Sequence, residues 1–351
     1  MHVDHLIIGQ GICGTFLSWY LQQANRSFLI IDEVRPNTAS RVAAGIINPV
    51  TGRRIVKTWM IDDVMPFAKT AYEQLGSRLN VTVIQQKNII DFFPTPQMRI
   101  AFHQRYTEDP RYLVIPAEQS KWKGYFHDDF GFGEIAPCLL ANVSDVLRVY
   151  RTYLSAALRE EVFDISLLRC THDRITYKDI TADTIIFCEG SDYTTNRYFN
   201  LLPFAPNKGE VLWIECKHLP DTNIFKNGVN LVPWAENIFW VGSSYQWEFA
   251  DEFPTESFRE KTMANLRRWL KVPFTLIDHK AAVRPATLER RPFVGFHPVY
   301  KNVGIFNGMG TKGCSLSPYL AKAFVEHIVN AAPLRPDIDI SRFKNVLSKT
   351  N

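Results

Sequence analysis

The N-terminal segment combines two apolar runs with a stretch of helical periodicity. The first run, Val3 to Ile8, leads directly into the glycine-rich turn Gly9 to Gly14. Apolar residues then recur at helical spacing through about Gln23, and a second apolar run, Phe28 to Ile31, ends at an acidic pair. This succession of strand, glycine-rich turn, helix and strand predicts a βαβ unit.

The rest of the chain separates into helical and strand-rich segments. Helical periodicity predicts helices over about 59–75, 143–159, 256–270 and 317–330. The region from about 81 to 133 alternates in places like strands and carries several prolines and aromatics, which indicates an antiparallel sheet. Further strands are predicted over 164–170, 184–188, 210–215, 229–232, 238–241 and 303–306. We therefore expect an α/β (α+β two-domain) fold, in which a Rossmann-like domain built from both ends of the chain carries an inserted antiparallel-sheet domain.

Composition excludes several classes of protein. A chain of 351 residues that is 46% hydrophobic and 22% charged is long enough to bury a sizeable core and lacks the bias of a disordered segment. The net charge of +4 gives no argument for nucleic acid. A glycine turn interrupts the apolar N-terminus too early for a signal peptide, and no uncharged apolar stretch approaches the roughly 18 residues needed to span a bilayer. We expect a cytoplasmic protein without a membrane span. The sequence does not indicate its oligomeric state.

The six cysteines are scattered along the chain and form no CxxC pair. Reduced, packed thiols are the default for such residues. Neither disulfides nor a metal site is therefore expected.

The turn after the first strand has the spacing of a dinucleotide-binding fingerprint. Gly9 permits the tight turn, Gly11 lets the backbone approach a pyrophosphate, and Gly14 lets the helix pack against the strand. Ile12 and Cys13 complete the expected cofactor-binding turn at the helix N-terminus, which attracts phosphates.

An acidic pair follows at the end of the second strand. Asp32 lies 18 residues beyond Gly14, where a carboxylate can bind both ribose hydroxyls of a dinucleotide. Glu33, its neighbour, is included in the expected cofactor-binding set. The fingerprint does not distinguish FAD from NAD, and a glycine-rich turn without a ligand is the alternative.

The next segment distinguishes the two cofactors. Residues 39–49 read Ala-Ser-Arg-Val-Ala-Ala-Gly-Ile-Ile-Asn-Pro. This segment resembles the ASxxAAGxxxP loop of the D-amino-acid oxidase-like flavoprotein superfamily. The resemblance implies FAD as cofactor, with Ser40, Arg41, Ala44 and Gly45 lining the pyrophosphate and the flavin ring. An ordinary alanine-rich loop is the alternative.

Three C-terminal motifs strengthen that resemblance. Arg284-Pro285-Ala286-Thr287, then residues 292–295 (Pro-Phe-Val-Gly) and the turn 308–313 follow in the order of the RPxT, PxIG and glycine-turn motifs of glycine oxidase-like enzymes. The turn implies backbone N–H groups and a helix N-terminus at one edge of the flavin, where they stabilise the negative charge of the reduced ring. The residues expected to act there are Gly308, Gly310, Thr311, Lys312 and Gly313.

Two further strands fit the same family. The apolar strand that closes on Gly190 is similar to the family's strand ending at a glycine beside the cofactor. By the same resemblance, the strand near Leu168 contacts adenine through its backbone. Together the motifs imply an FAD-binding domain of segments 1–80, 140–205 and 281–345 and a substrate domain of segments 81–139 and 206–280.

The resemblance implies an FAD-dependent amine oxidoreductase. In this superfamily the C–N bond of an amino acid or N-substituted glycine-type amine is oxidised to an imine by hydride transfer to flavin N5, without a metal. Arg284 matches the arginine that binds the substrate carboxylate, a role that suits a guanidinium fork. A structural arginine before a proline is the alternative.

The chain departs from the glycine oxidase pattern on the substrate side. A second arginine of that family falls at about Thr311 here, and Asn230 replaces a tyrosine before the Leu-Val-Pro run, so glycine is in doubt as substrate. Lys312 either supplies charge to the flavin edge or the substrate, or is a solvated loop lysine. Tyr245 and Trp234 are further candidates for the substrate pocket, with core packing as the alternative.

Two other functions stay open. The turn 308–318 also resembles the oxidoreductase half of the bacterial tRNA carboxymethylaminomethyl-uridine modification enzyme, which oxidises the same type of bond. In that case a phosphate backbone would be contacted by Arg53, Arg54, Lys57, Arg290 and Arg291, although short basic clusters are usually solvated. A flavin-binding scaffold without activity is the second alternative. A pyridine-nucleotide oxidoreductase is disfavoured, because the sequence holds no second GxGxxG. The chirality of the substrate, the electron acceptor and a covalent link through Cys314 are left open.

Overall fold

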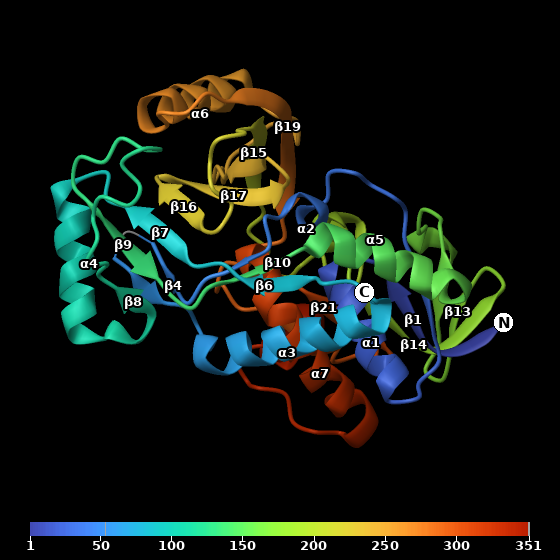
Figure 1. The fold of residues 1–351 in the computed structure, drawn as a ribbon. Helices are drawn as coiled ribbons and strands as arrows, with labels where there is room; N and C mark the ends of the chain where they lie inside the picture. The colour runs from blue at the N-terminus through green and yellow to red at the C-terminus, as the bar shows by residue number, and fades with distance from the viewer. Residues whose placement is uncertain (53, 350–351) are drawn as a thin grey trace.

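The computed structural model describes residues 1–52 and 54–349, and two eight-stranded sheets dominate it (Figure 1). In the first sheet, β1 (His2–Ile8) pairs in parallel with β2 (Phe28–Ile31) and with β14 (Ile180–Phe187). Its other strands are β11 (Leu158–Arg159), β12 (Leu168–Cys170), β13 (Ile175–Tyr177), β20 (Phe293–Phe296) and β21 (Val303–Asn307). Parallel neighbours need crossover connections, and α1 (Ile12–Gln23) forms the first of them.

Helices cover one face of this first sheet. α1, α3 (Ile61–Leu79), α5 (Val143–Leu154) and α7 (Gly313–Asn330) share one apolar core with sheet residues such as Ile186. Alternate residues of the same strands face the other side and pack against the segment around Phe199 and the C-terminal segment around Ile340. Because both faces are covered, the strands read as continuous apolar runs in the sequence.

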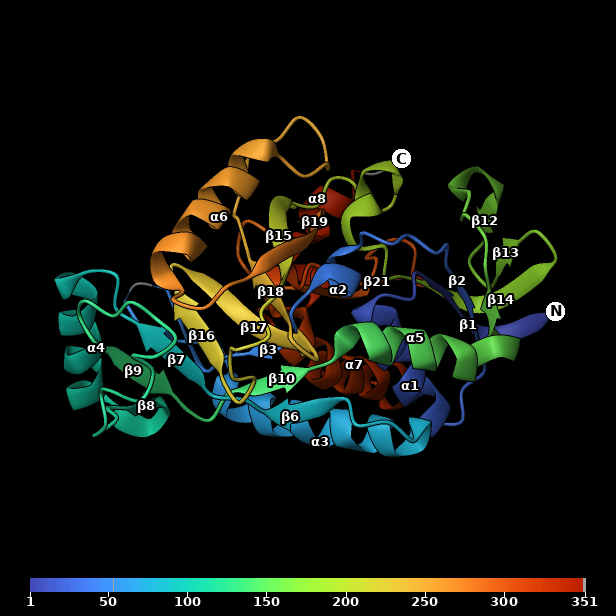
Figure 2. The same cartoon turned by 45° about the horizontal axis from the view of Figure 1, so that its top comes forward.

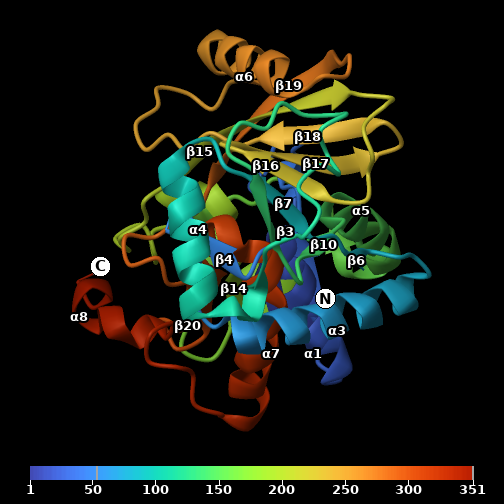
Figure 3. The same ribbon diagram turned by 60° about the vertical axis from the view of Figure 1, so that its left-hand side comes forward.

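The second sheet has the order β19-β15-β18-β17-β16-β7-β9-β8 and is antiparallel except for the β16–β7 pair. α6 (Glu256–Trp269) packs on one of its faces, and Figure 3 shows the sheet between α6 and the rest of the chain. The strands are β7 (Ile89–Phe92), β8 (Leu113–Val114), β9 (Phe132–Ile135), β15 (Asn207–Glu215), β16 (Ile224–Asn227), β17 (Val229–Ala235), β18 (Ile238–Gly242) and β19 (Thr275–Arg284).

Short elements join the two large sheets. α2 (Ala39–Val42) lies beside β18 and β19 (Figure 2), and the Trp240 indole N–H donates to the Val42 carbonyl at 2.9 Å. Two small sheets lie in the same region, one formed by β3 (Ile46–Ile47), β10 (Leu139–Ala141) and β6 (Ile84–Gln86), the other by β4 (Val50–Thr51) and β5 (Val56–Lys57).

The expected fold class is confirmed, with two local corrections. The helix expected to run to about residue 159 ends at Leu154, and Leu158–Arg159 forms β11, which pairs with β2. Helix α4 (Pro96–Glu108) lies in the region where only strands were predicted. Its start carries a local signal, because the Thr95 side chain accepts from the Met98 N–H and Pro96 occupies the first turn. Its apolar side chains follow no clear helical stripe, and Phe102 is its one fully buried residue.

The expected division into domains stays a prediction. β10 and β19 each cross one of its boundaries, at 139/140 and 280/281. In the described part of the chain, no helix is both long enough and apolar enough to cross a membrane.

Candidate functional site

A cavity of about 550 Å³ lies where the carboxyl ends of β1, β2 and β14 meet β15 and β19. Ligands of open parallel sheets bind at this edge of the strands. Most of the predicted site residues line this one cavity: Gly9, Gly11, Ile12, Cys13, Asp32, Glu33, Ser40, Arg41, Ala44, Gly45, Gly190, Gly310, Thr311, Lys312 and Gly313 on the expected cofactor side, and Asn230, Tyr245 and Arg284 on the expected substrate side.

Two predicted glycines shape the backbone without lining the cavity. A β-carbon on Gly14 would lie 1.9 Å from the Gly9 carbonyl oxygen, so only glycine allows α1 to approach the turn this closely. Gly308 has a φ of +81°, and a β-carbon there would lie 2.8 Å from Cγ2 of Thr287.

Two other predicted residues lie away from the cavity. Leu168 is packed in the sheet core, and its carbonyl accepts from Arg197 at 3.1 Å. Residues 161–163 line the cavity in its place. Trp234 packs edge-on against Trp213 with ring centroids 5.6 Å apart, whereas Trp240 lines the cavity, which the sequence interpretation missed.

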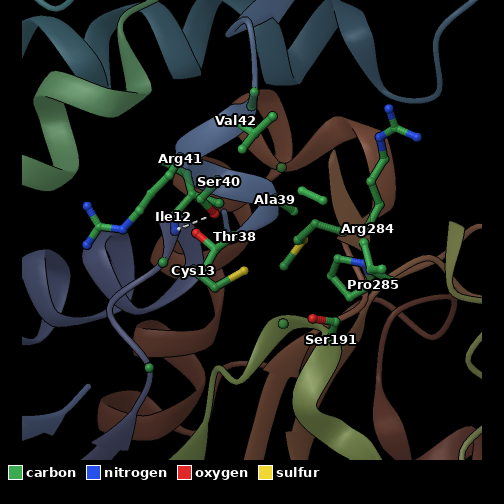
Figure 4. A pocket seen from close by; sticks show the side chains of 18 of the residues that line it. Ile12, Cys13, Thr38, Ala39, Ser40, Arg41, Val42, Ser191, Arg284 and Pro285 are labelled. Atoms are coloured by element: carbon green, nitrogen blue, oxygen red, sulfur yellow. Dashed lines mark hydrogen bonds between the residues drawn. The ribbon is translucent and has the colours of Figure 1, made fainter. Parts of the chain in front are cut away.

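The N-terminus of α1 opens on the cavity; its N-cap residue, Gly11, has no side chain to cap it, and its first turn holds no acidic residue. The Ile12 N–H donates to Ser40 Oγ at 3.2 Å, which joins α1 to α2 (Figure 4). A β-carbon on Gly11 would lie 3.2 Å from the same oxygen. An uncapped helix start flanked by glycine is a cradle for a pyrophosphate.

Asp32 lies at the cavity, held from two sides. Its carboxylate accepts from the Gln10 N–H and from Arg151 Nη1, both at 2.7 Å. A carboxylate has about four acceptor sites, so this arrangement leaves room for ribose hydroxyls. Sequence interpretation missed Arg151, since it is 119 residues away in the chain on a helix with no motif.

A second ionic link closes the same end of the cavity. Arg35 pairs with Glu33 and, at 2.9 Å, with Asp192, and all three residues line the cavity. Glu33 is therefore engaged by Arg35. Burial raises the pKa of nearby Glu189 to about 8, so this carboxyl group is mostly protonated at neutral pH.

The loop after α2 and the C-terminal turn form the middle of the cavity. A β-carbon on Gly45 would lie 1.8 Å from the Ala141 carbonyl oxygen, which is why a glycine is needed where the loop passes β10. The Gly310 N–H donates to the Pro285 carbonyl at 3.1 Å. This bond places the C-terminal turn directly beside the residue that follows Arg284.

Arg284, at the end of β19, is largely buried and held by neutral groups. Its Nη1 donates to Asn207 Oδ1 at 2.6 Å and to the Ser244 carbonyl at 3.2 Å, and its Nη2 donates to Ser243 Oγ at 2.7 Å. The guanidinium lies 4.8 Å from the ring centroid of Tyr245. No described acid forms an ion pair with it, and burial lowers its pKa from a very high value. Figure 4 shows Arg284 and Arg41 extending from opposite sides of the view.

Lys312 is partly buried and lines the cavity. Burial lowers the pKa of its ammonium group to about 8. Its neighbours Cys138 and Cys314 are buried thiols whose pKa values burial raises, that of Cys314 to about 11. They therefore stay neutral and do not balance its charge.

The basic clusters weighed for RNA contact are partly engaged within the protein. Lys57 pairs with Asp62, and the Arg291 guanidinium lies 4.3 Å from the Trp59 ring centroid and 3.7 Å from a carboxylate oxygen of Asp337. Arg54 and Arg290 are exposed. Arg53 lies outside the described residues.

Comparison with solved structures shows the same fold. Glycine oxidase from Geobacillus kaustophilus superposes with a TM-score of 0.77 at 18% identity, over 97% of this chain and 98% of that one. Iminodiacetate oxidase from Chelativorans sp. superposes with a TM-score of 0.73 at 20% identity, over 95% of this chain and 96% of that one.

Sequence comparison gives the family. Glycine oxidase from Pseudomonas putida is 26% identical over 137 residues, 38% of this chain and 37% of that protein, so the alignment spans just over a third of the relative. The model of the family described as "FAD dependent oxidoreductase" (DAO) matches residues 4–327, which include the glycine fingerprint, the loop at 39–49 and the C-terminal turn. The glycine-flanked helix start, the acid directly after β2 and the closely packed glycines fit the cofactor that this family uses. The chain therefore belongs to the DAO family of FAD-dependent oxidoreductases.

Proposed function

We propose that this flavoprotein oxidises the C–N bond of an amine that carries a carboxylate, in other words an α-amino acid or an N-substituted glycine. The observation that carries the proposal is Arg284, a largely buried cation on the cofactor cavity that has no acidic partner among residues 1–52 and 54–349. A buried charge of this kind is costly unless an anion binds to it.

The hydrogen bonds of Arg284 favour a bidentate ligand. Asn207, Ser243 and the Ser244 carbonyl engage Nη1 and one N–H of Nη2. Within the described chain, Nε and the other N–H of Nη2 donate to no residue. The guanidinium therefore keeps two free donors for a ligand, which suits the two oxygens of a carboxylate.

FAD, when bound, supplies the two-electron acceptor that allows the amine to become an imine, which water then hydrolyses. The residues of this chain hold the substrate. Arg284 binds the carboxylate and thereby fixes the adjacent carbon in the cavity. Val211, Trp240 and Ala282 provide an apolar wall that limits access of water.

The names of the relatives support the same substrate class. Two are glycine oxidases and one is an iminodiacetate oxidase. Glycine and iminodiacetate are amines that carry carboxylates. In this chain Asn230 and Thr311 stand where the glycine oxidase pattern has a tyrosine and an arginine, so we propose a substrate other than glycine.

The test is anaerobic reduction of the bound flavin. The purified protein is mixed with glycine, sarcosine, iminodiacetate, a panel of D- and L-amino acids and a tRNA that contains carboxymethylaminomethyl-uridine. We expect a carboxylated amine to bleach the flavin absorbance. Arg284→Met should raise the KM of that amine by roughly 100-fold, the loss of two charged hydrogen bonds. Arg99→Met, at an exposed position on α4, is the matched control and should leave KM unchanged.

The alternatives give different outcomes in the same experiment. Bleaching by the tRNA alone would establish the RNA-modifying function instead. A protein that binds FAD but is bleached by no amine would be a flavin-binding scaffold. An Arg284→Met variant with unchanged KM would refute the role of Arg284.

A further inference from the structure

A second unpaired cation opens on the same cavity. Lys312 ends the short helical turn η5 (Gly310–Lys312), directly before α7. Its ammonium group forms no hydrogen bond and no ion pair with any residue of the described ranges 1–52 and 54–349. The two titratable groups that act on it, Cys138 and Cys314, are thiols whose pKa values burial raises, so they stay neutral and cannot balance the charge.

The two cations flank one part of the cavity. Backbone contact between Gly310 and Pro285, at 3.1 Å, places the turn of Lys312 beside the end of β19 that carries Arg284. Arg284 extends from there towards Gly209 and Ser243 of the second sheet. Lys312 instead lies near Cys138, close to β10. Both residues line the same cavity, so one ligand bound there can meet both charges.

The acidic residues of the cavity do not neutralise this pair. Asp32, Glu33, Glu161 and Asp192 also line the cavity, but each is paired with a cation, namely Arg151, Arg35, Lys178 and Arg35 respectively. Glu252 is exposed on the loop before α6, and the Glu189 side chain accepts from Asn196 Nδ2 at 2.7 Å. Arg284 and Lys312 thus line the cavity without an acidic partner among the described residues, as does Arg41.

We propose that the substrate is a dicarboxylic amine, whose first carboxylate binds Arg284 and whose second carboxylate pairs with Lys312. This inference rests on the proposed function and narrows it to one substrate class. Dicarboxylic amino acids and N-carboxymethyl amino acids belong to this class. Lys312 is then a specificity-determining residue, because it discriminates between amines with one and two carboxylates without being needed for oxidation itself.

The competing role for Lys312 is to stabilise negative charge on the reduced flavin. The two roles predict different effects of replacing the lysine. A residue that serves the second carboxylate changes only the binding of dicarboxylates. A residue that serves the flavin changes the reduction potential of the bound cofactor for every substrate.

The test uses the FAD-loaded protein and two non-oxidisable probes, acetate and malonate, whose binding is followed by the change in flavin absorbance. We expect malonate to bind more tightly than acetate. Lys312→Met should weaken malonate binding by roughly 10- to 100-fold, the loss of one charged contact, and leave the Kd of acetate and the flavin potential unchanged. Lys312→Arg keeps the charge and should keep the preference, and Lys261→Met, exposed on α6, should behave as the unmodified protein.

Two results would overturn the inference. One is equal affinity of the unmodified protein for acetate and malonate. The other is a shift of the flavin potential in Lys312→Met with the preference for malonate intact. If Lys312→Met does not fold, Lys312→Gln and Lys312→Arg answer the same question through the ratio of the two affinities. Failure of the proposed function gives a different result, because no amine then reduces the flavin. If only the present inference fails, sarcosine and iminodiacetate both reduce the flavin, and Lys312→Met changes neither reaction.

Discussion

A β-carbon placed on Gly209 would lie 1.8 Å from Nη2 of Arg284. Gly209 is a strand residue of β15, paired with Ala282 of β19, and the guanidinium of Arg284 passes directly over it. Because Gly209 has no side chain, the guanidinium of Arg284 can occupy the space above it. Hydrogen bonds to Asn207, Ser243 and Ser244 hold the guanidinium there, so the arginine cannot move aside at low cost.

Gly209→Ala should therefore displace Arg284 while leaving the cofactor side intact. We expect FAD to remain bound, KM for the carboxylated substrate to rise at least tenfold, and stability to fall by about 1–3 kcal/mol from overpacking. Steady-state kinetics and thermal unfolding measure the two effects. Gly124→Ala is the control, because a β-carbon there meets no atom within 4 Å. An unchanged KM would show that Arg284 does not depend on this position.

Gly14→Ala tests the cofactor side. The added β-carbon would lie 1.9 Å from the backbone oxygen of Gly9, which belongs to the tight turn and cannot rotate away as a side chain can. Helix α1 must shift, so we expect a colourless protein with a lowered Tm that excess FAD does not fully restore. Measured FAD content equal to that of the unmodified protein would contradict this prediction. Gly124→Ala again provides the comparison.

Arg151→Met removes the cation that holds Asp32. Both side chains are only 15% exposed, so the pair is worth more than a surface ion pair. We expect the free energy of unfolding to fall by roughly 1.5–3 kcal/mol and the Kd of FAD to rise severalfold, as measured by denaturant unfolding and fluorescence titration of the apoprotein. Arg148→Met, on the same helix but 68% exposed, should change stability by less than about 0.5 kcal/mol. Equal effects of the two substitutions would argue against a buried role for Arg151.

The carboxyl group of Glu189 predicts a pH dependence of stability. Burial raises its pKa in the folded protein to about 8, well above the ordinary value of 4.5 in the unfolded chain. Between these two values the folded state holds a proton that the unfolded state has lost, so the stabilising contribution is complete below pH 4.5 and is lost as the pH rises through 8. Glu189→Gln should flatten the fall in Tm between pH 5 and pH 8.5, whereas Glu260→Gln, exposed on α6, should not. Identical pH profiles for Glu189→Gln and the unmodified protein would refute this reading of the carboxyl group.

The sequence predicted those parts of the structure in which the residues of one local motif determine the local backbone geometry. Gly9 and Gly14 require close backbone contacts that no other residue allows, and apolar runs buried on both faces identify the central strands. Arg284 follows from a motif in the same way, although its role as a substrate ligand is still a prediction.

The residues that sequence missed depend on contacts between distant segments. Arg151 and Arg35 reach partners 119 and 157 residues away, and nothing near them in the chain signals either contact. α4 was missed because the apolar positions of residues 96–108 form no helical stripe. The Thr-Pro pair at its start is the one local signal that could have indicated it. Leu168 was placed at the cofactor by analogy with a strand, but the chain reaches the cavity a few residues earlier, at 161–163.

The position of Arg284 at the end of β19 has a consequence for the substrates that the cavity can accept. The strand carries Arg284 at its last position, and one residue later the carbonyl of Pro285 is bonded to the turn at Gly310. Arg284, the proposed ligand of the carboxylate, is therefore linked to the turn at Gly310 by one peptide bond and one hydrogen bond, which fixes the separation of the two. Under the proposed function, substrates can differ in what extends beyond the reacting carbon, but the distance from carboxylate to that carbon must match this fixed separation. Insertion of one residue between Arg284 and Pro285 would change this separation for every substrate at once.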